Sequence, residues 1–533
     1  MRTLNIDGRP SDQPSARELQ FQAAVLASAV TVTVSLLSRY ILRAPLVPEV
    51  LSEFVFAVLP ISLVEAGVSL LGAFAKQLGM LACVVAYFLA LTGSAFVFLG
   101  LNRRVSAPGI VILVIFTWAA TLLVLFPLLG AGLLGANLRQ GRTAASMWML
   151  AIYSVFAIAV SYFSARYLGA QPEPAADGSN SGAVQSGRSR PATLIGRRSI
   201  ARWTFYAILG VAFYDVGRAL LDPLLRLGAG RVRHGTGIFP SIDGLATEVT
   251  SVSDFYDVSK NVSDPDVDVR RWQLQISGTV QNAASLSYDQ IRQLPFVEHY
   301  ATLECISNEV GGGLIGNALW RGVRLRDLLE QAALKPGVFD IVLKAADGYT
   351  DSIPVERALA DGTILAYEMN GYPLDQTHGF PLRLIVPGIY GMKNVKWITA
   401  IEAVDFDFKG YWQKRGWDDR AEYKTMSRID VPGASIKGSA TTIAGIAFAG
   451  DRGIQRVQVS TDGGKNWQDA EFKPGLSRYS WTLWHMDWTP ASPGPALLIV
   501  RATDGTGVTQ TSSHAPAIPN GASGYDSRTV RVV

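Results

Sequence analysis

The stretch HGFPLRLIVPGIYGMKNVKW, residues 378–397, decides which kind of soluble domain this chain contains. Its continuous apolar run LRLIV fits a buried strand. The strand feeds a loop with two glycines, where missing side chains let backbone amides approach an anion. Lys393 and Lys396 supply cationic donors, and Arg383 adds a planar guanidinium suited to phosphate oxygens. Taken alone, the stretch fits either an anion-binding loop or an ordinary strand, turn and strand with solvated lysines.

Composition divides the 533-residue chain into two parts. Residues 21–221 are mostly apolar runs broken by short arginine-bearing loops, whereas the sequence from residue 231 onward has charged turns and aromatic strands. The net charge of +4 is too small to indicate nucleic-acid binding. The two cysteines cannot build a disulfide framework, a zinc cage or an iron–sulfur cluster. We therefore expect a membrane part followed by soluble domains.

Six apolar segments are near the length of about 20 residues that a helix needs to cross a bilayer. They are residues 21–40, 51–73, 78–100, 109–129, 145–168 and 200–221. All five histidines lie outside these segments, so the helices cannot hold a haem between two histidines and are expected to form an anchor, a docking surface or a quinone site. Glu65, in the second segment, is either functional or snorkels to the interface. Asp215 and Arg218, in the sixth segment, are three residues apart and can pair on a helix.

A linker separates the fifth and sixth segments. Residues 171–199 are rich in Gly, Ser, Pro and Ala and read as flexible, between a membrane domain at 1–170 and a sixth helix at 200–222. The linker ends in Arg197-Arg198, which either resembles a twin-arginine export signal or marks the cytoplasmic end of a helix. Both interpretations put the linker inside the cell. The positive-inside rule then places the soluble domains on the outer side of the plasma membrane.

Cys305 is the only cysteine beyond the apolar part, and it lies in ATLECISNEVGGGLIGNALWRGVRL, residues 301–325. A lone cysteine is more often a small buried hydrophobe than a ligand. The run HYATLEC predicts a strand that delivers Cys305 at its end, and Ser285 or Ser287 is the expected N-cap of a preceding helix. Short strands and helices alternate irregularly through Val404, which indicates a mixed α+β domain rather than a regular doubly wound sheet.

Residues 429–533 lack helical periodicity and show short alternating runs separated by turn signals. This pattern predicts an antiparallel β-sandwich. The expected architecture is therefore an N-terminal α-helical transmembrane bundle, a mixed α+β domain at 231–428 and a C-terminal sandwich.

Three segments resemble, in the same order, segments of the sulfite oxidase family: SVSDFYDVSKNVSDPDVD at 251–268, the Cys305 stretch at 301–325, and residues 378–397. The resemblance implies the molybdenum cofactor, a molybdopterin, with Cys305 as the protein's metal ligand. Residues 231–428 would be the molybdopterin-binding catalytic domain. The C-terminal domain, with STDGGKNWQ as its best local match, would be immunoglobulin-like and would form a homodimer. The implied cofactor contacts are Tyr256, Asp257, Cys305, Asp347, His378, Arg383, Asn394, Val395 and Lys396.

The chain departs from the family at two places. The family's active-site tyrosine falls on Trp417 in YWQKRGWDD, and the position of its substrate-binding arginine is taken by the stretch Asp257 to Lys260. Arg415, Lys260 or Arg321 could bind an anionic substrate instead. Arg415 could equally pair with a neighbouring aspartate, and Asp347 could be an ordinary turn residue. Cys305, Arg415 and Trp417 form the predicted catalytic set.

The resemblance implies oxygen-atom transfer on a small sulfur- or nitrogen-containing substrate. Sulfite oxidation and sulfoxide reduction of the periplasmic methionine-sulfoxide reductase type are the alternatives. A non-catalytic membrane receptor or assembly protein with the same fold is the alternative from another class. The sequence has no Cys-x-x-Cys-His and no cluster spacing, so electrons are expected to pass to or from a separate partner such as a cytochrome or a quinone.

The predicted topology can be checked with reporter fusions. A reporter that is active only outside the cytoplasm, fused after Val533, is expected to give signal because the sixth helix would lead the chain across the membrane. A reporter that works only in the cytoplasm, fused at the same residue, should give none. A cytoplasmic C-terminus contradicts the six-helix topology.

Overall fold

The computed structural model describes residues 15–42, 44–59, 63, 74–102, 106–136, 138, 140–168, 242–261, 264–436 and 440–533. The chain divides into two compact units, residues 1–225 and 226–533. Several sequence-based predictions lie outside the described residues: Glu65, the linker at 171–199, Arg197-Arg198, the sixth helix at 200–221, Asp215 and Arg218.

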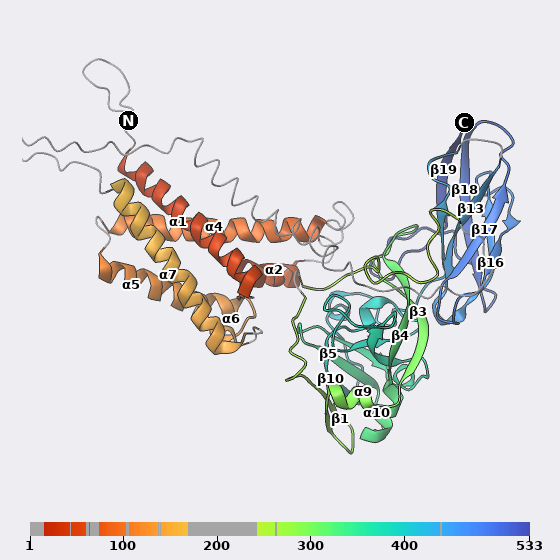
Figure 1. The fold of residues 1–533 in the computed structure, drawn as a ribbon, viewed down its shortest axis with the longest axis horizontal. Helices are drawn as coiled ribbons and strands as arrows, with labels where there is room; N and C mark the ends of the chain where they lie inside the picture. The colour runs from red at the N-terminus through yellow and green to blue at the C-terminus, as the bar shows by residue number, and fades with distance from the viewer. Residues whose placement is uncertain are drawn as a thin grey trace, which may run out of the picture. The chain divides into compact units, whose positions relative to one another are not determined.

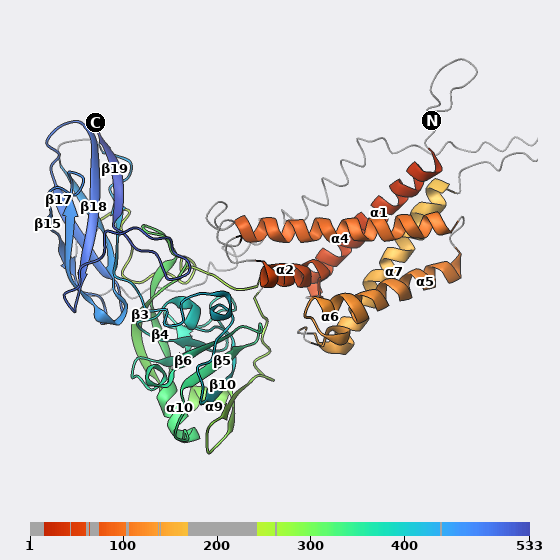
Figure 2. The same cartoon turned by 180° about the vertical axis from the view of Figure 1, so that it is seen from behind.

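The described part of the N-terminal unit is helical (Figures 1 and 2). Its α-helices are α1 (Ala16–Leu42), α2 (Val47–Val58), α4 (Phe74–Leu101), α5 (Ala107–Ala119), α6 (Phe126–Leu128) and α7 (Gly141–Leu168). A π-helical turn, Ala120–Leu125, joins α5 to α6, and a short 3₁₀ turn, Leu133–Gly135, precedes α7. In the second predicted segment, 51–73, the described residues are helical from 51 to 58 and at Leu63.

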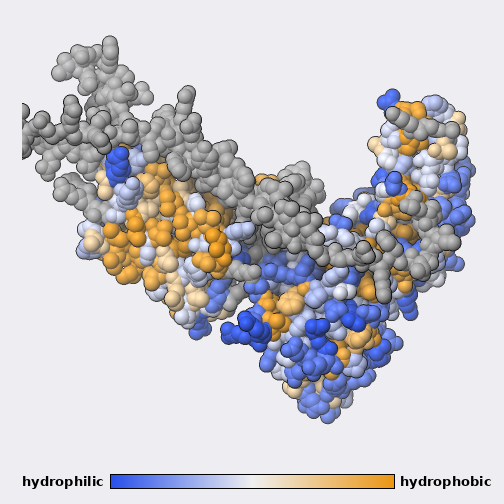
Figure 3. Space-filling model, viewed as in Figure 1, coloured by the Kyte–Doolittle hydropathy of each residue, from blue (hydrophilic) through white to orange (hydrophobic). Residues whose placement is uncertain are grey.

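Four helical segments among the described residues are long and apolar enough to cross a membrane: Ala16–Leu42, Leu78–Leu101, Ala107–Leu128 and Gly141–Leu168. They agree with the first, third, fourth and fifth predicted segments. Large apolar side chains such as Leu89, Ile112 and Phe116 are exposed on them. Figure 3 shows apolar residues gathered over these helices. An exterior of this kind is unfavourable in water and suits a lipid surface.

The mixed α+β part of the second unit contains two sheets. The first sheet has the order β2 (Ala284–Ser287), β1 (Gln273–Gly278), β10 (Ile398–Val404), β5 (Asp340–Ala345), β6 (Thr350–Pro354). Only β1 and β10 run parallel; the other pairs in this sheet are antiparallel. The second sheet is antiparallel, with the order β3 (Val297–Glu304), β4 (Ile315–Arg324), β7 (Ile364–Met369), β8 (Tyr372–Pro373), and β9 (Arg383–Ile385) also pairs with β7.

Short helices complete this part: α9 (Tyr288–Gln293), α10 (Leu325–Ala332) and α11 (Val355–Ala358). Of the two predicted N-caps, Ser287 caps α9. Its hydroxyl accepts from Gln290 N while the Gln290 side chain accepts from Ser287 N, a reciprocal capping box. The first sheet packs on α9 and α10 through fully buried apolar side chains. These include Leu274, Ile291, Leu329, Ile341 and Ile401.

The C-terminal part is built from two further sheets. One has the order β11 (Met426–Val431), β13 (Thr441–Phe448), β17 (Thr482–Trp488), β16 (Glu471–Lys473). The other has the order β12 (Ser435–Ile436), β19 (Asp526–Val532), β18 (Gly494–Asp504), β14 (Ile454–Ser460), β15 (Gln468–Asp469). Side chains from both sheets, among them Ile443, Trp484, Val459 and Val500, share one core. The domain is thus a two-sheet β domain, in which β12 and β19 pair in parallel.

The C-terminal domain contacts the strand that leads to Cys305. Thr302 N on β3 donates to Tyr479 O at 2.9 Å, and Trp481 N donates to the Thr302 hydroxyl at 2.9 Å. The Ser477 hydroxyl donates to Tyr300 O on the same strand. β3 is therefore held along one edge by β4 and at its other edge by this loop, residues 477–481.

His299 on β3 makes the free energy of unfolding depend on pH. Its ring meets the Tyr479 ring edge-on at 5.5 Å, and burial lowers the pKa of His299 from 6.5 to about 4. The unfolded chain binds a proton here below about pH 6.5, and the folded chain does so only near pH 4. Stability is therefore full above about pH 6.5 and falls as the pH drops toward 4, by at most about 3 kcal/mol.

Thermal unfolding of the detergent-solubilised chain between pH 7.5 and 4.5 tests this dependence. We expect His299→Leu to lose less stability on acidification than the unaltered protein, because leucine has no proton to bind. Identical pH slopes for the two proteins would contradict the assignment.

Candidate active site

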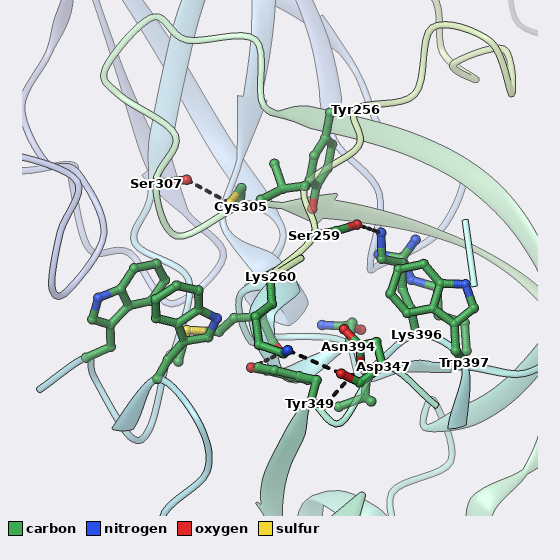
Figure 4. A pocket seen from close by; sticks show the side chains of 17 residues that line it. Tyr256, Ser259, Lys260, Cys305, Ser307, Asp347, Tyr349, Asn394, Lys396 and Trp397 are labelled. Atoms are coloured by element: carbon green, nitrogen blue, oxygen red, sulfur yellow. Dashed lines mark hydrogen bonds between the residues drawn. The ribbon is translucent and has the colours of Figure 1, made fainter. Parts of the chain in front are cut away.

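Five separate stretches of the chain line one pocket, which Figure 4 shows from close by. They are the segment before β1, the turn after β3, the turn between β5 and β6, the stretch from β9 to the start of β10, and the segment after β10. The lining residues are Tyr256, Val258, Ser259, Lys260, Cys305, Ser307, Asp347, Tyr349, Arg383, Gly391, Met392, Asn394, Val395, Lys396, Trp397, Trp412 and Trp417.

Most of the predicted site residues meet in this pocket. Eight of them line it: Tyr256, Cys305, Asp347, Arg383, Asn394, Val395, Lys396 and Trp417. Asp257 is exposed and does not line the pocket, and its carboxylate accepts from Lys396 Nζ at 2.8 Å. His378 is buried beside Phe255, with its Nε2 at 3.1 Å from Val252 O. His378 therefore does not line the pocket either.

Arg415 is a predicted catalytic residue that does not line the pocket. Its guanidinium lies over the Tyr411 ring at 3.7 Å, and its Nη1 donates to Tyr411 O at 2.7 Å. Arg321 does not line the pocket either. On β4 it pairs with Glu298 at 3.0 Å and Glu368 at 3.2 Å. Neither arginine is among the cations that face the pocket.

Cys305 follows the last residue of β3, as the sequence predicts. Its backbone N donates to Leu314 O and its carbonyl accepts from Asn308 N, both at 2.9 Å, so the turn at Cys305 is closed. Its Sγ lies 2.9 Å from the Ser307 hydroxyl. Burial raises the pKa of the Cys305 thiol, whereas hydrogen bonds from Ser307 lower it. A thiol in this environment needs a cation or a metal to become a stable thiolate.

Cationic and polar donors gather near the thiol. Lys396 Nζ donates to Asp257, to the Ser259 hydroxyl at 2.7 Å and to Thr377 O at 3.0 Å. Arg383 is a buried residue of the pocket lining, and its Nη1 donates to His378 O at 3.3 Å. The lysine and the arginine bring two positive charges to one wall, which suits an anionic group.

Two buried polar atoms at this wall have no hydrogen-bond partner among the described residues: the Tyr256 hydroxyl and Arg383 Nε. Burial holds the pKa of Tyr256 well above its ordinary value, so the hydroxyl keeps its proton and can donate. A buried donor without a partner costs about 1–3 kcal/mol, which a bound polar group would recover. These atoms therefore fit a ligand rich in acceptors.

Gly391 shapes the same wall. A Cβ built there would lie 2.5 Å from the Tyr256 hydroxyl and 3.1 Å from Glu304 O, so no larger residue fits without movement. The missing side chain lets the loop after β9 approach the end of β3. The anion-binding interpretation of this loop is thus compatible with its geometry.

Lys393 is placed differently from the sequence-based expectation. It is 1% exposed, and its Nζ donates to Ser352 O at 2.8 Å and to Asp351 at 3.1 Å. The other oxygen of Asp351 accepts from the Tyr349 hydroxyl at 2.7 Å. Lys393 therefore supports the pocket from inside and supplies no donor to its wall.

The structure also adds residues that the sequence did not single out for the site. Trp412 stacks on Trp417 with ring centroids 4.2 Å apart, and both line the pocket. Tyr349 follows the predicted Asp347 by two residues, and its backbone N donates to that carboxylate at 2.9 Å. Lys260, considered only as a substrate cation, lines the pocket and donates to Asp347 O at 3.2 Å. Val258, Ser259, Ser307, Met392 and Trp397 complete the set.

Comparisons with known proteins agree with this geometry. Residues 261–412 match the oxidoreductase molybdopterin binding domain, and residues 429–519 match the Mo-co oxidoreductase dimerisation domain. The mitochondrial sulfite oxidase of Mus musculus is 32% identical over 302 residues, covering 47% of this chain and 55% of that protein. The sulfite oxidase of Gallus gallus is 30% identical over 329 residues, covering 52% and 71%. The uncharacterized oxidoreductase YuiH of Bacillus subtilis is 33% identical over 155 residues, covering 29% and 76%.

The chain belongs to the sulfite oxidase family of molybdopterin-dependent oxidoreductases. It spans about half the length of the mammalian and insect relatives that it matches. The group implied by its catalytic domain is the molybdenum cofactor. The buried thiol, the unpartnered Tyr256 and Arg383 donors and the cradle at Gly391 fit such a group.

The buried pair of Lys393 and Asp351 gives a stability test. Lys393→Met is expected to cost about 3–5 kcal/mol, because it leaves the Asp351 carboxylate buried without its cation. Lys409→Met is the matched control, since Lys409 pairs with aspartates at the surface and such pairs contribute about 1 kcal/mol or less. Urea unfolding of both variants measures the difference. Equal losses would contradict the supporting role of Lys393.

Proposed function

We propose that this protein is a membrane-anchored molybdopterin-dependent oxidoreductase that transfers an oxygen atom to or from a small sulfur- or nitrogen-containing substrate. The observation that carries the proposal is the convergence of Cys305 with Tyr256, Arg383 and Lys396 on one pocket, although these residues come from distant segments. Family membership supports the same chemistry.

Different residues of the pocket would bind different parts of the molybdenum cofactor. Cys305 would be the metal's protein ligand, since a soft thiolate suits a metal–sulfur centre. Lys396 and Arg383 would hold the anionic end of the cofactor, and the Tyr256 hydroxyl would donate to one of its acceptors. When bound, the molybdenum cofactor supplies two-electron oxygen-atom transfer. The protein's part is to orient it and to keep the site away from bulk water.

Two reactions compete for this site. Sulfite oxidation is the first candidate, because the relatives named above are sulfite oxidases. Sulfoxide reduction is the second, and it is favoured by the stacked pair of Trp412 and Trp417. The stacked rings give this wall an apolar face, which suits a neutral molecule, and an indole N–H can donate to its acceptor oxygen. Lys260, which also lines the pocket, would contact an oxyanion substrate.

The remaining parts are proposed to serve anchoring, assembly and electron exchange. The four long apolar helices would anchor the enzyme, with its soluble domains outside the cytoplasm. The C-terminal domain would be an immunoglobulin-like sandwich that pairs two copies of the chain, in line with its match to a dimerisation domain. A separate cytochrome, quinone or other carrier would exchange electrons with the metal, since the sequence has no haem-attachment or cluster motif.

Metal analysis of the purified full chain, expressed with cofactor supply, tests the enzyme proposal. We expect about one molybdenum per chain in the unaltered protein and loss of the metal in Cys305→Ser, because the metal's protein ligand is removed. Cys83→Ser is the control, since Cys83 lies in α4 of the helical unit and should leave the metal content unchanged.

An artificial-acceptor or artificial-donor assay with sulfite, a sulfoxide and other small oxyanions then separates the candidate reactions. A protein with neither molybdenum nor a fluorescent pterin product contradicts the enzyme proposal. It would favour the non-catalytic receptor or assembly role, for which Cys305→Ser should leave partner binding unchanged.

A further inference from the structure

Ser307 makes a direct contact with the sulfur of Cys305. Its hydroxyl lies 2.9 Å from Sγ (Figure 4). Ser307 also lines the pocket. The hydroxyl therefore contacts the sulfur from inside the site, and Ser307 is not one of the predicted cofactor contacts.

The turn that carries Ser307 is fixed from several sides. Asn308 N donates to Cys305 O at 2.9 Å, and the Asn308 side chain accepts from Leu314 N at 2.8 Å and donates to Glu304 at 2.9 Å. Arg428 of the C-terminal domain donates to Gly312 O at 2.9 Å. The backbone of the turn is thus held in one conformation, which places the Ser307 hydroxyl near the sulfur.

The direction of the hydrogen bond follows from the chemistry of a ligand sulfur. A metal-bound cysteine is a thiolate and has no proton, so it can only accept, and Ser307 must donate. A hydrogen bond to a sulfur ligand withdraws negative charge from it and weakens its donation to the metal. In iron–sulfur and copper proteins such bonds raise the reduction potential of the metal. Partners of this kind orient and tune metal ligands generally.

We infer that Ser307 is a positioning residue for the Cys305 thiolate, and that its hydroxyl raises the reduction potential of the metal centre. This inference rests on the proposed function. A higher potential makes the centre a better acceptor of electrons from substrate and a poorer donor to a carrier. The hydroxyl would therefore bias the direction in which the site runs and restrict which carriers can accept its electrons.

The test is a redox titration of the purified, molybdenum-loaded full chain, followed by electron paramagnetic resonance of the odd-electron metal state. Ser307→Ala is expected to keep the metal content of the unaltered protein and to have a more negative midpoint potential. A tenfold change in the one-electron equilibrium corresponds to about 59 mV. Ser307→Thr keeps the hydroxyl and should restore the potential. Ser285→Ala is the control. It removes an exposed hydroxyl on β2 that donates to Gln273 on β1, and it should leave the potential unchanged.

Each result decides the question. Full metal content with an unchanged potential in Ser307→Ala overturns the inference and leaves the proposed function intact. Loss of metal from both Ser307→Ala and Ser307→Thr also overturns it, because Ser307 then serves only to hold the turn. An unaltered protein without molybdenum overturns the proposed function itself, and this inference with it.

Discussion

The pairing of β3 along both of its edges is the constraint on which the site depends. Backbone N–H and C=O groups that are buried must be bonded, and β3 satisfies them through β4 on one edge and through residues 477–481 on the other. The strand therefore ends at a defined place, and Cys305 follows its last residue. The position of Cys305 is thus set by a sheet and by a loop of the C-terminal domain together.

The segment that enters the C-terminal domain links the two halves of the site. Tyr423 N donates to Gly388 O at 3.1 Å in the loop after β9, and the Tyr423 hydroxyl accepts from Glu304 N at 3.2 Å beside the cysteine. Tyr390 N donates to Ala421 O at 2.7 Å. Ala421 and Tyr423, which precede the residues matched to the dimerisation domain, thus connect the loop after β9 to the end of β3 beside Cys305.

Two lysines three residues apart show how the fold divides charge. Lys393 neutralises Asp351 inside the domain, which keeps Tyr349 in place at the pocket wall through its bond to that carboxylate. Lys396 lies at the wall itself and is held by Asp257 and Ser259. A buried charge needs a partner to be tolerated, and a charge at the wall can still reorganise toward a ligand. The two similar side chains therefore have different roles.

Local patterns were enough to predict the strand before Cys305, an N-cap at Ser285 or Ser287 and the apolar segments seen as long helices, because periodicity and caps act over a few residues. Resemblance added a set of contacts, most of which meet in one pocket. The sequence could not predict three features of the site. Lys393 is buried against Asp351, Arg321 pairs with two glutamates, and Trp412 stacks on Trp417. The sequence by itself determined which chemical groups are present. The tertiary structure decided which of them face the pocket, because that choice depends on contacts between segments far apart in the chain.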